Sequence, residues 1–202
     1  MQYAPTIVLI DLLKIENSAL AVISMSLVHI IGIGGIGTSA LARHFLENGF
    51  QVSGSDLNKS LITDELKKEG AEIFLGHDSK NISPKSDLVV FSEAIPPDNP
   101  ELKKAQELSI KTESYFSALG KVSKDLESVI IAGTHGKSTT GAMLAQILIE
   151  NDKDPTVFIG SLLRFMDNKN YRPGGKTAVI EACEYRENFL KLHPKNMLFL
   201  NA

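Results

Sequence analysis

The chain has 202 residues, of which 43% are hydrophobic and 22% are charged, and its net charge is −3 with a pI near 6.0. This composition indicates a soluble globular protein with one good core or two small ones, and it excludes a disordered or fibrous chain. Because no basic excess is present, nonspecific binding to nucleic acid or to an anionic membrane is not expected.

The opening segment, residues 1–27, is strongly apolar. Asp11, Lys14 and Glu16 interrupt it well short of the length that a membrane-spanning helix needs, so we expect no transmembrane helix. Two interpretations stay open: a non-native extension from an upstream start codon, or an amphipathic helix packed on the domain. No secretory signal is recognisable and the single cysteine, Cys183, cannot form an internal disulfide, so the expected location is the cytoplasm.

A regular alternation of strands and helices begins at Val28. A β-rich run at 28–31 leads into a glycine turn and then a helical pattern that stops at Asn48-Gly49. Three more strands and a charged helix are expected at 50–56, 71–77, 86–92 and 101–109. The alternation predicts an α/β domain whose parallel sheet is covered by helices on both faces.

The polar segment 120–128 is expected to be a flexible domain boundary, which divides the chain into residues 28–122 and 123–202. The second part opens with a strand expected at 128–132 and a helix expected from Lys137. The apolar stripe of this helix is expected to comprise Met143, Leu144, Ile147 and Leu148.

The first chemical motif is a glycine turn with the sequence GIGGIG, in which Gly35 adds a further small residue. Gly32 permits a tight turn, Gly34 lets the backbone approach a pyrophosphate, and Gly37 allows the helix to pack closely on the strand. The anion would lie at a helix N-terminus. Asp56 follows Gly37 by 19 residues, where a carboxylate can accept hydrogen bonds from ribose. The motif does not distinguish NAD from a UDP-sugar, and glycines kept only for the turn are the alternative.

The second motif, GTHGKST, resembles a phosphate-binding loop at a junction of strand and helix, but it is short. Two residues separate its first glycine from the Gly-Lys pair, whereas the usual loop has four. Its glycines let backbone N–H groups converge on phosphate oxygens, and Lys137 supplies positive charge to the β- and γ-phosphates. The candidate ATP-binding residues are Gly133, Thr134, His135, Gly136, Lys137, Ser138 and Thr139.

A magnesium ion would complete such a site. The Ser138 hydroxyl is placed to ligate Mg²⁺, and Glu181 follows the apolar run KTAVI, where a strand end would face the loop in a parallel sheet. A solvated surface acid is the alternative for Glu181.

Other polar residues have two interpretations each. If the ligand is a UDP-sugar, His77 can approach its uridine or sugar or bond to the backbone, and Ser92 can contact the nucleotide or cap a turn. Cys183 is expected to be a small apolar filler and not a nucleophile. Glu184 and Arg186 join a polar network at the reaction site or form a solvated ion pair.

Taken together, the motifs of the chain resemble those of the Mur ligases. The resemblance covers nearly everything after Val28 and rests on VHIIGIGGIGTSALA, VSGSD, FLGHD, FSEAIPPDNPEL, GTHGKST and IEACEYRENFLKLHP, in the family's order. It implies a Rossmann-like domain that holds the UDP part of a substrate, followed by the start of a P-loop ATPase-type α/β domain. Gly32, Gly34, Gly37 and Asp56 would then contact diphosphate or uridine and not NAD.

The resemblance also implies an activity, which is ATP-dependent amide-bond formation in peptidoglycan precursor synthesis. The lactyl carboxylate of UDP-N-acetylmuramate attacks the ATP γ-phosphate to give an acyl phosphate, and the amine of L-alanine displaces phosphate. Lys137 and His135 would be catalytic, while Ser138 and Glu181 would hold Mg²⁺. A ligase that recycles whole peptides onto UDP-N-acetylmuramate, a non-catalytic nucleotide-binding module and a dehydrogenase remain as alternatives.

Two positions depart from the pattern of the Mur ligases. Arg186 stands where many members have aspartate, and Ser161 follows Gly160 where many have a second glycine. The family also continues past LFLNA into further ATP-binding segments and a C-terminal domain. We therefore expect a partial sequence with little or no ligase turnover by itself. No pattern indicates the oligomeric state.

Overall fold

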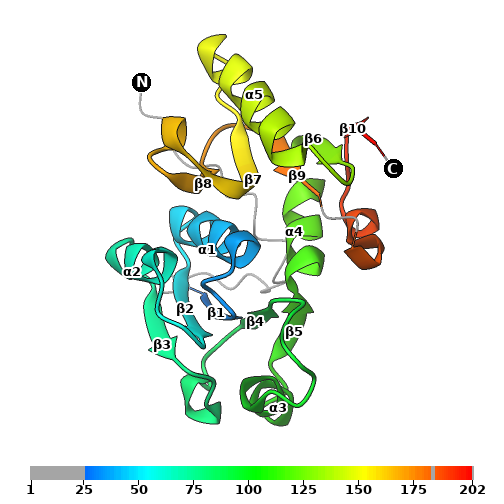
Figure 1. The fold of residues 1–202 in the computed structure, drawn as a ribbon. Coiled ribbons are helices and arrows are strands. Elements are labelled where there is room, and N and C mark those ends of the chain that lie inside the picture. Colours follow the sequence, from blue (N-terminus) through cyan, green and yellow to red (C-terminus); the bar gives the residue numbers. More distant parts are fainter. Residues whose placement is uncertain (1–25, 183–184, 202) are drawn as a thin grey trace, which may run out of the picture.

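The computed structural model describes residues 26–182 and 185–201, and it contains two five-stranded sheets (Figure 1). The first sheet has the order β3-β2-β1-β4-β5 and all its strands are parallel. Its strands are β1 (Leu27–Ile31), β2 (Gln51–Asp56), β3 (Glu72–Leu75), β4 (Leu88–Phe91) and β5 (Lys111–Ser114). The expected parallel α/β architecture is confirmed, and the order reverses direction at β1, as in Rossmann-like folds.

Helices connect these strands because each crossover between parallel strands must return the chain to the same end of the sheet. They are α1 (Ile36–Glu47), α2 (Leu61–Lys68), α3 (Pro100–Glu107) and α4 (Tyr115–Lys124), with a short 3₁₀ helix η2 (Ser79–Asn81). Strands β1 to β4 lie within a few residues of the runs expected from the sequence, whereas β5 was not expected. Four short apolar strands are therefore recognisable from local pattern alone.

The second sheet has the order β10-β6-β9-β7-β8, in which β8 alone among the described strands runs antiparallel to its neighbour. Its elements are β6 (Glu127–Ala132), α5 (Lys137–Glu150), β7 (Thr156–Leu163), η3 (Arg164–Met166), β8 (Lys169–Arg172), β9 (Thr177–Glu181), η4 (Tyr185–Lys191) and β10 (Asn196–Phe199). The second part of the chain is thus a mixed α/β unit that begins with a strand, a glycine loop and a helix.

The segment 120–128, expected to be a flexible domain boundary, consists largely of helix and strand, and its role as a boundary stays a prediction. Helix α4 continues through Lys124, and Gly120, Val122 and Ser123 are buried within it. The Ser123 hydroxyl donates to the Gly120 carbonyl and accepts the His193 N–H at 3.0 Å, so tertiary contacts hold the polar residues in place. A polar composition does not predict flexibility where each polar group has a buried partner.

The apolar stripe expected on α5 is wrong in part. Met143 and Ile147 are 60% and 55% exposed, whereas Gly141 and Ala145 are buried. The reason is close packing on β7, because a Cβ atom added at Gly141 would lie 2.5 Å from Ile159 Cδ1. The buried face of α5 is therefore set by its small residues.

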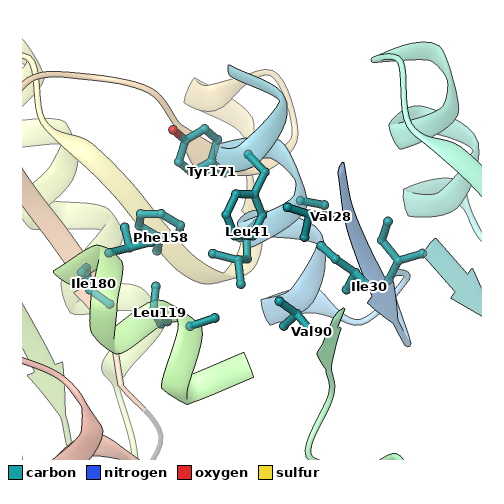
Figure 2. Packing of buried hydrophobic residues seen from close by; sticks show 14 of the residues in the cluster. Val28, Ile30, Leu41, Val90, Leu119, Phe158, Tyr171 and Ile180 are labelled. Carbon is teal, nitrogen blue, oxygen red and sulfur yellow. The ribbon is translucent and has the colours of Figure 1, made fainter. Parts of the chain in front are cut away.

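One hydrophobic cluster spans both sheets, and helix α1 lies between them (Figure 1). Figure 2 shows Leu41 of α1 between Val28 and Ile30 of the first sheet and Phe158 and Tyr171 of the second. All five side chains are at most 3% exposed. This shared core joins the two sheets into one packed body.

A buried polar group also connects the sheets. Asn170 of β8 is fully buried and donates hydrogen bonds to the Ile36 carbonyl and, at 2.9 Å, to Ser39 Oγ of α1. Its Oδ1 accepts a 2.5 Å hydrogen bond from Arg43 Nη1, and Arg43 Nε also donates to Glu69 Oε2 at 2.9 Å. Because a buried amide is costly unless its donors and acceptor are satisfied, this group specifies how β8 sits on α1.

Within the described part of the chain, no helix has both the length and the apolar character needed to cross a bilayer. Residues 1–25 lie outside the described ranges, so both interpretations of the opening segment remain predictions.

Candidate functional site

Two helices of the fold begin differently from the others. Helices α1 and α5 start after Gly35 and Gly136, with no side-chain cap hydrogen bond and no acidic residue in the first turn. The other three α-helices are capped by the side chains of Ser60, Asn99 and Ser114. Uncapped N–H groups together with the helix dipole make a helix N-terminus attractive to an anion. The two glycine motifs therefore lie at the two helix ends best suited to phosphate.

The glycine turn before α1 is held by the strand beside it. Gly32 has φ +78°, a conformation that favours glycine, and the N–H groups of Gly32 and Ile33 both donate to the Ser55 carbonyl, at 2.8 and 3.0 Å. Thr38 Oγ1 donates to the Gly32 carbonyl at 2.6 Å. These hydrogen bonds satisfy part of the main chain of the turn, and Gly35 and Ile36 at the start of α1 are exposed.

Gly34 and Asp56, expected at one site, are in direct contact. The Gly34 N–H donates to Asp56 Oδ2 at 2.9 Å, and a Cβ atom at position 34 would lie 2.8 Å from that oxygen and 3.0 Å from Thr63 Cγ2. Asp56 Oδ1 accepts the Asn58 N–H at 3.2 Å. The absence of a side chain at Gly34 therefore leaves room for the Asp56 carboxylate. The proposed contact of Asp56 with ribose stays a prediction.

Gly37 has a different partner from the one expected. A Cβ atom there would lie 2.7 Å from Cζ of Tyr115, the first residue of α4. The sequence pattern predicts that the missing side chain at Gly37 lets α1 pack closely on its own strand. In the structure the ring of Tyr115, 78 positions later in the chain, occupies that space.

His77 and Ser92 lie near the same end of the first sheet. His77 Nδ1 is 2.9 Å from Ser55 Oγ and 3.5 Å from Oε2 of the buried Glu101. Burial acts to raise the pKa of Glu101, but hydrogen bonds from His29, Ser55 and other groups outweigh it and the pKa is lowered. His77 is thus tied into a buried acidic network.

Ser92 is placed against the glycine turn. Its Cβ would lie 3.1 Å from a Cβ added at Gly32, and its Oγ accepts the Ala94 N–H at 3.4 Å. This contact supports the turn-capping interpretation of Ser92, while contact with a nucleotide stays a prediction.

The phosphate-type loop lies between β6 and α5. Gly133 and Gly136 have φ values of +135° and +83°, which side-chain-bearing residues rarely adopt. Lys137 Nζ donates to the carbonyls of Gly133 and Thr134, at 2.5 and 3.3 Å, so the lysine folds back over the loop. Thr134, His135 and Thr139 are exposed beside it.

The structure brings Ser138 and Glu181 together. Ser138 Oγ donates to Glu181 Oε1 at 2.9 Å, and Glu181 Oε2 accepts the Gly160 N–H at 2.8 Å. Mg²⁺ prefers oxygen ligands and commonly takes one or two from protein, with phosphates and water supplying the rest. The oxygens of Ser138 and Glu181 fit that chemistry. Among residues 26–182 and 185–201 there is no cluster of three or more His, Cys, Asp or Glu side chains that could hold a metal by itself.

The comparisons with known proteins agree with this arrangement. A protein-family model described as "Mur ligase family, catalytic domain" matches residues 27–126 of the chain. The UDP-N-acetylmuramate–L-alanine ligase of Acetivibrio thermocellus is 46% identical over 175 residues, and that of Clostridium acetobutylicum is 43% identical. The matches cover 86% of this chain. The chain belongs to the Mur ligase family.

Solved Mur ligases have the same fold. UDP-N-acetylmuramate-alanine ligase MurC from Thermotoga maritima has 36% sequence identity and a TM-score of 0.78, over 85% of this chain and 40% of that one. The UDP-N-acetylmuramate:L-alanyl-gamma-D-glutamyl-meso-diaminopimelate ligase from Neisseria meningitides has 26% identity and a TM-score of 0.81, over 88% and 61%. The chain spans 37% to 38% of the length of the curated relatives named above.

This Mur ligase chain contains one loop contact that local pattern did not reveal. Asn201, which follows β10, bonds to both main-chain polar atoms of His135. The available signal was a polar residue directly after an apolar strand. Cys183 and Glu184 lie outside the described residues, as does the side chain of Arg186, so the expectations for them remain predictions.

Proposed function

We propose that the chain carries the UDP-binding and ATP-binding parts of a ligase that joins L-alanine to UDP-N-acetylmuramate. The observation that carries the proposal is the pair Ser138 and Glu181 at the uncapped start of α5, in a chain whose α1 is uncapped as well. Two separate anion sites fit a reaction with two nucleotide substrates. Relatives named as this ligase, 42% to 46% identical, support the choice of substrates.

The first site would hold the diphosphate of UDP-N-acetylmuramate at the start of α1. The N–H groups of the first helical turn, after Gly35, would donate to phosphate oxygens. Asp56, already bonded to Gly34, keeps Oδ1 toward the chain that follows β2, where it also accepts the Asn58 N–H. We assign Asp56 to the nucleoside end of the substrate.

The second site would hold ATP at the start of α5. Lys137 now donates to two loop carbonyls, and an arriving β- or γ-phosphate would offer it a charged acceptor in their place, which makes a stronger hydrogen bond. Ser138 and Glu181 would hold Mg²⁺, which when bound would neutralise phosphate charge. The main-chain N–H of His135 is bonded to Asn201, so the exposed His135 would contribute through its imidazole.

In the proposed reaction the substrate carboxylate attacks the γ-phosphorus of ATP and ADP leaves, which forms an acyl phosphate. The amine of L-alanine then attacks the acyl carbon, and phosphate leaves as the amide bond forms. Lys137 would stabilise the negative charge of the transferring phosphoryl group, and the shared core of the two sheets would hold the two substrates in register. We further propose that the reaction takes place in the cytoplasm, where ATP is available.

Isothermal titration calorimetry of the 202-residue chain tests the proposal. We expect UDP-N-acetylmuramate to bind and NAD not to bind, and we expect ATP to bind more tightly with Mg²⁺ than without it. Binding of NAD with no binding of the UDP-sugar would refute the assignment of the first site.

A ligase that adds a peptide to UDP-N-acetylmuramate is the second candidate, because the structure from Neisseria meningitides reaches a TM-score of 0.81. Its sequence identity of 26%, against 36% for the structure from Thermotoga maritima, favours L-alanine. Both candidates predict the same UDP-sugar and differ in the amine that is ligated.

A further inference from the structure

The shortened phosphate loop is held by a side chain from the neighbouring strand. Asn201 Oδ1 accepts the His135 N–H at 3.0 Å, and Asn201 Nδ2 donates to the His135 carbonyl at 3.1 Å. Strand β10 pairs with β6, with Phe199 opposite Ala132, and the Leu200 N–H donates to the Ala132 carbonyl at 3.0 Å. The sheet thus delivers Asn201 to the side of the loop.

The main chain at Asn201 also packs on the first glycine of the loop. A Cβ atom added at Gly133 would lie 3.1 Å from both the nitrogen and the oxygen of Asn201, and 3.2 Å from Leu200 Cβ. The missing side chain at Gly133 therefore eases this approach, and its φ of +135° also favours glycine. The contacts with Asn201 thus involve Gly133 and His135, on either side of Thr134.

Two side chains hydrogen-bond to the main chain of residues 133–136 in the described structure, those of Lys137 and Asn201. In the proposed ATP site Lys137 transfers its hydrogen bonds from the loop carbonyls to phosphate. Asn201 then remains to hold the loop. A loop with two residues between its glycines has few internal groups to fix its own shape, so an external partner has a large share in it.

We propose that Asn201 is a positioning residue of the phosphate loop: it holds both main-chain polar atoms of His135, so that the loop keeps its phosphate-receiving shape when Lys137 moves to the nucleotide. This rests on the proposed function of the loop as an ATP site. It also assigns the His135 N–H to the protein, so that phosphate is received by the other amides of the loop and by the first turn of α5.

The test compares Asn201→Ala with Asn196→Ala, which removes the same side chain at the exposed opposite end of β10. Calorimetry would measure binding of Mg²⁺-ATP and of UDP-N-acetylmuramate, and NMR would measure hydrogen exchange of the His135 amide. For Asn201→Ala we expect about tenfold weaker Mg²⁺-ATP binding, since two hydrogen bonds are lost, and faster exchange at His135. In Asn201→Ala, the affinity for UDP-N-acetylmuramate and the melting temperature should stay close to those of the wild type. In Asn196→Ala, both affinities, the exchange rate of the His135 amide and the melting temperature should all match the wild type.

A second variant separates the two hydrogen bonds. Asn201→Asp keeps the acceptor for the His135 N–H and loses the donor, so exchange at His135 should stay slow while Mg²⁺-ATP binding weakens through the added negative charge. Wild-type affinity for Mg²⁺-ATP in Asn201→Ala would overturn the inference and leave the proposed function intact. A loss of melting temperature and of both affinities together would show a structural role only and would also overturn it. If the wild-type chain binds no ATP, the proposed function fails first and the inference with it.

Discussion

The Ser138 hydroxyl donates a 2.9 Å hydrogen bond to Oε1 of Glu181, a residue 43 positions later in the chain. The contact forms because β9 pairs in parallel with β6, which places the end of one strand beside the helix that follows the other. Glu181 is held from its other oxygen by the Gly160 N–H, at 2.8 Å. A carboxylate held through one oxygen by Gly160 therefore presents its other oxygen to Ser138.

Removing the charge of Glu181 should weaken the effect of magnesium on ATP binding. Glu181→Gln keeps the size of the side chain but removes the anionic ligand, so we expect at least about a tenfold loss of Mg²⁺-dependent ATP affinity. Calorimetry with and without Mg²⁺ measures it. Glu150→Gln, at the other end of α5, is the matched control and should leave the affinity unchanged. An unchanged magnesium effect in Glu181→Gln would remove Glu181 from the metal site.

Removing the loop lysine should affect one nucleotide site and not the other. Lys137→Ala deletes the positive charge beside the phosphates, and we expect Mg²⁺-ATP affinity to fall by about tenfold or more because a charge-assisted contact is lost. Affinity for UDP-N-acetylmuramate, bound at α1, should change little. Lys153→Ala, an exposed lysine just past the end of α5, provides the control. Equal losses for both ligands would indicate damage to the fold rather than to the site.

A methyl group at Gly37 should displace the ring of Tyr115. The added Cβ would lie 2.7 Å from Tyr115 Cζ, so we expect Gly37→Ala to destabilise the protein by about 1–3 kcal/mol. Urea unfolding measures the change. In a Tyr115→Ala background the same substitution should cost much less, because the ring that it meets is absent. Additive losses in the double variant would exclude the ring as the cause.

Stability should fall between pH 7 and pH 5 because of one buried histidine. Burial lowers the pKa of His44 from 6.5 to about 4. The unfolded chain therefore binds a proton below pH 6.5 that the folded chain takes up only near pH 4, so stability is lost as the pH falls through this window. Over the whole window the upper limit is about 3.5 kcal/mol, at about 1.4 kcal/mol per unit of pKa difference, of which about 2 kcal/mol falls above pH 5.

Urea unfolding at pH 7 and pH 5 checks this expectation in the wild type and in His44→Gln. The variant should lose most of the difference between the two pH values, whereas His193→Gln, at an exposed position, should keep it. The lowered pKa of Glu101 acts below pH 4.5, outside the range compared. An equal pH dependence in wild type and His44→Gln would refute the assignment.

Much of the site could be predicted from the sequence, for a local reason. Short runs of residues predict the strands, the glycine turn and the loop before α5, because backbone conformation depends mainly on neighbouring positions. Glu181 beside Ser138 followed from the rule that parallel strands end at one edge of a sheet.

Tertiary structure alone decided what occupies the space beside each glycine. Gly34 admits Asp56, Gly37 admits the ring of Tyr115, and Gly133 admits the main chain of Asn201. It also buried Ser123 in a helix where the polar sequence indicated a flexible linker. The physical reason is that a glycine reports only that a side chain is missing, while the atoms that fill the gap come from segments brought there by packing of the two sheets.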